Sequence, residues 1–89
     1  MKTVSETKTF ARKAANIWSE EERLDFITYI SSNFNRGDVI SGANGYRKIR
    51  WTTKGTGKRG GTRIIYLNVN NDLVLLVDIY SKSKKENWQ

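Results

Sequence analysis

Cationic side chains gather in one interval of the chain. Seven of the 16 Lys and Arg residues lie between Asp38 and Asp72, with no acidic residue among them. They are Arg47, Lys48, Arg50, Lys54, Lys58, Arg59 and Arg63. The other nine Lys and Arg residues equal the nine Asp and Glu residues in number, so the formal charge of +7 comes from this interval. Such a concentration predicts a polyanionic partner.

Aromatic residues lie in or beside the same interval: Tyr46, Trp51, Tyr66 and Tyr80. Bases of single-stranded RNA stack on aromatic rings while cations hold the backbone, so this combination favours an RNA-binding surface. The alternative is that Trp51 and Tyr66 belong to the core and that the cations only keep the sheet in solution.

Histidine and cysteine are both absent, which excludes thiolate and imidazole metal ligands and any Ser-His or Cys-His nucleophile. Catalysis would have to use Lys, Arg, Tyr, Asp or Glu. The glycine-rich stretch at 55–61 does not have the spacing of a phosphate-binding P-loop and precedes a strand, so we discard a nucleotide site.

The elements that would position these residues fit into one domain, residues 1–89, with a modest core. No apolar run approaches the roughly 18 to 20 residues of a membrane span, and the N-terminus lacks the apolar core of a signal peptide. We therefore expect a cytoplasmic protein that needs no membrane.

The first half of the chain predicts a strand and a helix. Residues 2–11 alternate loosely, as in an edge strand. Ser19 with Glu22 forms a capping box, which places a helix from there to about Asn33. Its acidic first turn is interpreted as capping rather than catalytic. Its apolar face is predicted from helical spacing to comprise Leu24, Ile27, Ile30 and Phe34.

The second half predicts hairpins. Val39 and Ile40, between two turns, are expected to enter the core. Residues 46–52 alternate as a strand, with Lys48 and Arg50 on one face and Arg47, Ile49 and Trp51 on the other. Two further strands follow, at 62–70 and 73–80. The expected fold is α+β, with an antiparallel sheet of about four strands and the N-terminal helix or helices packed on one face.

Several short motifs also occur in a characteristic order, namely residues 37–40, Gly42 and Gly45, residues 47–51, residues 57–66 and residues 80–82. Together they resemble the RelE/HigB family of type II toxin-antitoxin toxins, from about residue 10 to residue 87. The resemblance implies a RelE-like fold and an endoribonuclease that cuts mRNA, generally on the ribosome, without metal or cofactor. It also implies a cognate HigA-like antitoxin with an acidic segment.

The resemblance also implies roles for particular residues. Arg63 would stabilise the pentavalent phosphorane formed when the 2′-hydroxyl attacks the adjacent phosphorus. Lys58 or Lys82 would be the general base, since a dense cluster of cations lowers a lysine pKa. Tyr80 would stack a base or donate a proton, or else cap the core. The RNA-binding residues would be Arg47, Lys48, Arg50, Trp51, Lys54 and Arg59.

Two alternatives stay open. The first is a non-catalytic RNA- or ribosome-binding module that uses the same surface. The second is a degenerate toxin kept as a binding partner. Some relatives have a functional tyrosine near the C-terminus, where this chain has Trp88, and an indole cannot donate a proton in its place.

Overall fold

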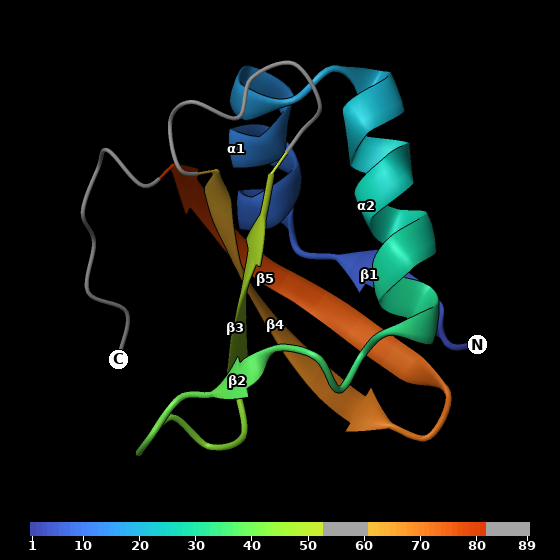
Figure 1. Cartoon of the computed structure of the whole chain (residues 1–89), viewed down its shortest axis with the longest axis vertical. Coiled ribbons are helices and arrows are strands. Elements are labelled where there is room, and N and C mark those ends of the chain that lie inside the picture. The colour runs from blue at the N-terminus through green and yellow to red at the C-terminus, as the bar shows by residue number, and fades with distance from the viewer. Residues whose placement is uncertain (53–60, 82–89) are drawn as a thin grey trace.

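The computed structural model describes residues 1–52 and 61–81, which form two helices and five strands (Figure 1). In chain order these are β1 (Thr3–Glu6), α1 (Lys8–Ile17), α2 (Glu20–Ser32), β2 (Asp38–Val39), β3 (Arg47–Trp51), β4 (Thr62–Asn70) and β5 (Leu73–Ser81). Neither helix of these segments has the length and apolar composition that a membrane crossing needs. The α+β class expected from the sequence is confirmed.

The sheet is mixed rather than purely antiparallel. Its strand order is β1-β5-β4-β3-β2, and the pairs β2–β3, β3–β4 and β4–β5 are antiparallel. The hairpins predicted the antiparallel pairing of β3–β4 and β4–β5, whereas β2 was not predicted as a strand. The edge strand β1 instead runs parallel to β5. Parallel neighbours need a crossover between them, and here the rest of the fold connects the two strands, so short-range patterns did not reveal the pairing.

Strand β5 contains an extra residue. The register moves from Ile65 opposite Asp78 to Tyr66 opposite Leu76, which leaves Val77 without a partner on β4. The carbonyl of Val77 instead accepts a hydrogen bond of 3.0 Å from the Thr7 hydroxyl. Such a β-bulge changes which side chains of a strand share a face.

Helix α1 begins where a strand was expected. The N-terminal strand stops at Glu6, and Thr7 caps the helix by accepting a 3.0 Å hydrogen bond from the Phe10 amide. Phe10 and Ala14, four residues apart, are buried on one helix face. The prediction of a strand over residues 2–11 was therefore wrong from Lys8 onward. A single apolar residue, Phe10, fits the two-residue period of a strand as well as the 3.6-residue period of a helix.

The capping box of α2 is confirmed. The Ser19 amide donates to the Glu22 carboxylate at 2.8 Å, and the Glu22 amide donates to the Ser19 hydroxyl at 3.2 Å. The helix ends at Asn33, its C-cap, as predicted. Leu24, however, is 48% exposed, so its predicted place on the core face is wrong. Phe26, four residues before Ile30, occupies that face instead.

Both helices pack on one face of the sheet, where the core lies. The core is formed by Phe10, Ala14, Trp18, Phe26, Ile30, Ile49, Ile64, Tyr66, Val74, Leu76 and Ile79. Val39 was expected in the core but is 59% exposed, because β2 is a two-residue edge strand beyond the cover of the helices.

Candidate nucleic-acid interface

The face of the sheet opposite the helices carries a row of functional candidates from three strands. Three isoleucines in register point into the core: Ile49, Ile64 and Ile79. Successive side chains of a strand point to opposite faces. Their neighbours Arg50, Arg63 and Tyr80 therefore share the other face, where Arg50 lies opposite Arg63 and Arg63 lies opposite Tyr80. We call these three residues the cross-strand row.

The cross-strand row places two arginines directly opposite each other on neighbouring strands. Side chains directly opposite on antiparallel strands have Cβ atoms about 4.5–5.5 Å apart, and like charges in such positions destabilise the pair. Arg50 is exposed and Arg63 is half-buried. An anion bound between them would remove the repulsion, so this arrangement suits a phosphate ligand.

The next row on this face carries one further exposed cation, Lys48, opposite Ile65 on β4. Ile65 in turn lies opposite Asp78. The Asp78 carboxylate is paired with Lys13 of α1 at 2.8 Å. A cation from the helical layer therefore compensates Asp78. A second acidic residue, Asp38 of β2, lies opposite Lys48.

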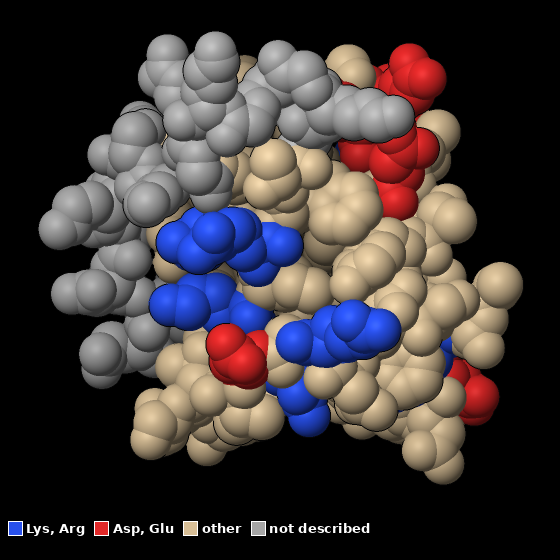
Figure 2. Space-filling view, viewed as in Figure 1, with Lys and Arg blue, Asp and Glu red and all other residues tan. Residues whose placement is uncertain are grey.

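Charge is segregated on the surface. Figure 2 shows Lys and Arg side chains gathered over β3 and the adjoining β2 segment, with an acidic side chain among them. A larger acidic group lies apart from them, at the start of α2, where Glu20, Glu21 and Glu22 form the first turn. An approaching polyanion would be attracted to the β3 region and repelled by the start of α2.

Arg47 points away from the cross-strand row. It shares the face of Ile49, and its guanidinium donates to the carbonyl oxygens of Gly37 at 2.7 Å and Asn35 at 3.4 Å. These bonds fasten the loop between α2 and β2. The sequence did not indicate this structural role, and an RNA contact by Arg47 stays a prediction.

Tyr66 fastens the same loop from β4. Its hydroxyl donates to the Phe34 carbonyl at 2.8 Å and accepts from the Gly37 amide at 3.0 Å. A Cβ at Gly37 would lie 2.7 Å from this hydroxyl, so only glycine fits there. Tyr66 is 0% exposed, which confirms the alternative that it is a core residue. Burial raises the pKa of the Tyr66 hydroxyl above its ordinary value.

Two further aromatic candidates are partly or largely covered. Trp51 packs against Phe26 and Tyr29 of α2, with ring centroids 5.3 Å and 4.9 Å apart. Tyr80 is 6% exposed. Neither ring stands open as a stacking platform in this conformation, so charge is the more accessible recognition element of this surface.

The structure thus brings together Arg50, Arg63 and Tyr80, with Lys48 on the same face, and places Arg47 and Trp51 on the other. Four candidates lie outside the described residues: Lys54, Lys58, Arg59 and Lys82. No protein-family model matches the sequence.

Proposed function

We propose that the protein is a RelE/HigB-like toxin of a type II toxin-antitoxin system, a cytoplasmic endoribonuclease that cleaves mRNA on the ribosome without a metal ion. The observation that supports this most is the cross-strand row, in which Arg63 lies between Arg50 and Tyr80. Fixed positive groups placed where negative charge develops are the main contribution to catalysis of many group transfers.

In the proposed reaction the 2′-hydroxyl oxygen attacks the adjacent phosphorus. Its proton passes to a base, for which Lys58 and Lys82 are the candidates. The bond from phosphorus to the 5′-oxygen breaks, leaving a 2′,3′-cyclic phosphate, and the 5′-oxygen takes up a proton. Arg63, with Arg50 beside it, neutralises the phosphorane oxygens, because two guanidinium forks can bond several of these oxygens at once. In this proposal Tyr80 donates that proton or contacts the base.

Expression of the chain without an antitoxin tests the proposal. We expect growth arrest, together with new mRNA ends within ribosome-protected message, and we expect Arg63→Ala to abolish both. Arg12→Ala is the matched control, since Arg12 is an exposed cation on α1. If wild-type and Arg63→Ala at equal expression were equally harmless, or if Arg12→Ala relieved the arrest as well, the toxin proposal would fail.

The proposed partner is a HigA-like antitoxin that presents an acidic segment to Lys48 and Arg50, both exposed. Complementary charge steers such partners and makes their association sensitive to salt. The product of a neighbouring gene should be retained by the tagged protein at physiological salt and released as salt rises. Failure to retain it would remove this part of the proposal.

A non-catalytic RNA- or ribosome-binding module is the second candidate, and the burial of Tyr80, at 6% exposure, favours it. Such a module needs only the cations. It predicts salt-dependent binding to ribosomes with no new mRNA ends after induction. The end-mapping experiment therefore separates the two candidates.

A further inference from the structure

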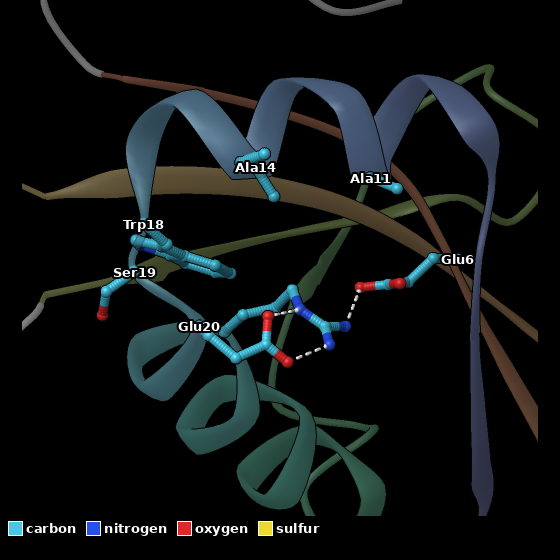
Figure 3. Close-up of a pocket in the computed structure, with 8 residues that line it drawn as sticks. Glu6, Ala11, Ala14, Trp18, Ser19 and Glu20 are labelled. Carbon is cyan, nitrogen blue, oxygen red and sulfur yellow. Dashed lines mark hydrogen bonds and ion pairs between the residues drawn. The ribbon is translucent and has the colours of Figure 1, made fainter.

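Carboxylates that lie beside cations of the helical layer are paired with them. Arg23 of α2 donates to the carboxylate of Glu6 at 2.7 Å and to that of Glu20 at 2.7 and 3.3 Å, as the dashed lines in Figure 3 mark. Lys13 of α1 is paired in the same way with Asp78. The fold itself therefore accounts for these three carboxylates, because each has a cation within hydrogen-bonding distance.

Asp38 of β2 is different. It lies directly opposite Lys48 on β3, so both side chains share the face of the sheet that carries the cross-strand row. Both residues are exposed, and within residues 1–52 and 61–81 no ion pair joins them. A carboxylate beside Lys48 and Arg50 also weakens the attraction of this surface for phosphate. Asp38 thus contributes neither to phosphate binding nor to an ion pair.

Tyr46 supplies an aromatic ring next to this carboxylate. The Ile40 amide donates to the Tyr46 carbonyl at 2.9 Å, which continues the pairing of β2 with β3 by one residue. Alternation along the chain places Tyr46 on the face of Lys48, and the residue is half-buried, so part of it is accessible. Tyr46 is therefore the diagonal neighbour of Asp38 across the strand pair, at a separation of about 7–8 Å.

A ring and a carboxylate in this relationship suit a nucleotide base. A base stacked on an aromatic ring is read by hydrogen bonds along its edge. A carboxylate only accepts hydrogen bonds, so it favours an edge that presents N–H donors. Guanine presents two adjacent donors, N1–H and the 2-amino group, to the two oxygens of one carboxylate. Uracil presents a single N–H between two carbonyl oxygens, which repel the carboxylate.

We propose that Tyr46 and Asp38 form a guanine-recognition site at one end of the cationic surface. The Tyr46 ring stacks on the base, the Asp38 carboxylate accepts from N1–H and the 2-amino group, and Lys48 and Arg50 hold the adjoining phosphates. This inference rests on the proposed RNA-binding function and adds a base preference to it. The carboxylate lowers the affinity for RNA in general and raises it for guanine, so it increases selectivity.

Binding of 2′-O-methyl oligonucleotides tests the site without cleavage, because the attacking hydroxyl is blocked. Uridine pentamers with guanosine, inosine or uridine at the centre are compared by fluorescence anisotropy on the full chain. We expect the guanosine pentamer to bind at least about fivefold more tightly than the uridine pentamer, the lower end of the range for a bidentate base contact. The inosine pentamer should bind with intermediate affinity, because inosine lacks the 2-amino group.

Variants assign this preference to particular side chains. Asp38→Ala should bring the ratio of guanosine to uridine affinity close to one. The same variant should bind the uridine pentamer at least as tightly as the wild type, because a repelling charge is removed, and this result also shows that it is folded. Asp25→Ala removes an equal charge from an exposed position of α2 and should leave the ratio unchanged. Tyr46→Leu should weaken binding of all three pentamers at least about fivefold, and Tyr46→Phe, which keeps the ring, should not.

The outcomes separate this inference from the proposed function. Equal wild-type affinities for the three pentamers, or a guanosine preference that survives Asp38→Ala, would overturn the guanine site and leave the endoribonuclease proposal standing. Undiminished binding by Tyr46→Leu would assign the ring to the sheet or to a protein partner and would overturn it too. Absence of binding to every pentamer would also overturn the inference, and if induction produced no new mRNA ends the proposed function would fall with it.

Discussion

Arg50 on β3 lies directly opposite Arg63 on β4, on the face of the sheet that the helices leave uncovered. Like charges in this relationship weaken strand pairing, and neighbouring positions of the same strands carry isoleucines that pair well. The two arginines therefore concentrate positive charge on the face of the sheet that we propose binds RNA.

The first prediction separates binding from stability at Arg50. Arg50→Gln should leave the free energy of unfolding unchanged or raise it by about 0.2–1 kcal/mol, because a like-charge pair is removed. The same change should lower the affinity for polyuridylate and reduce the slope of log affinity against log salt by about 0.7, the loss of one phosphate contact. Arg12→Gln removes an equal charge from α1 and should not change the slope; equal effects of the two variants would contradict a localised site.

The second prediction concerns the hydroxyl group of Tyr66. Tyr66→Phe removes the donor to Phe34 and leaves the buried amide of Gly37 without its acceptor. The free energy of unfolding in urea should fall by about 1–3 kcal/mol. Tyr29→Phe is the control, since the hydroxyl of Tyr29 makes no hydrogen bond within residues 1–52 and 61–81, and it should change stability much less. Equal losses would show that the loop is held by other contacts.

The third prediction is a pH dependence. Burial raises the pKa of Tyr66 in the folded state, so the unfolded chain loses this proton first, near the ordinary tyrosine pKa of about 10. The contribution of Tyr66 to stability is therefore complete below that pH and is lost as pH rises through the folded-state value. Wild-type stability should fall more steeply above about pH 10 than that of Tyr66→Phe. Parallel stability curves for the two proteins would contradict this assignment.

The fourth prediction tests the entry to β4 at Gly61. This residue has φ +84°, and a Cβ there would lie 2.9 Å from the Trp51 carbonyl oxygen and 2.9 Å from the Thr52 hydroxyl. Gly61→Ala should therefore destabilise the protein by more than about 1 kcal/mol, the usual cost of the left-handed conformation for a non-glycine residue. Gly42 has φ +73° with nothing within 4 Å of a Cβ, so Gly42→Ala carries only the conformational cost. Thermal unfolding should rank Gly61→Ala as the less stable variant.

Local chemistry made part of the fold predictable. The capping box of Ser19 and Glu22 was predictable because its partners are three residues apart, and the alternation of β3 correctly separated Arg50 from Arg47. The parallel pairing of Thr3 with Leu73 was not predictable, because it depends on residues 70 positions apart. The bonds of Arg47 to the carbonyl oxygens of the α2–β2 loop also have no pattern in the sequence. A cation in an alternating strand looks the same whether it binds RNA or a backbone oxygen.

The orientation of Tyr80 depends on the unpaired residue Val77. Val74 and Leu76 point into the core, and strict alternation would place Asp78 and Tyr80 there too. The extra residue reverses the phase, so that Ile79 enters the core and Tyr80 joins Arg63. The number of residues in β5, rather than their types, thus determines whether its tyrosine belongs to the cross-strand row. A homologue with one residue fewer in β5 would keep its tyrosine in an alignment and yet present it to the helices.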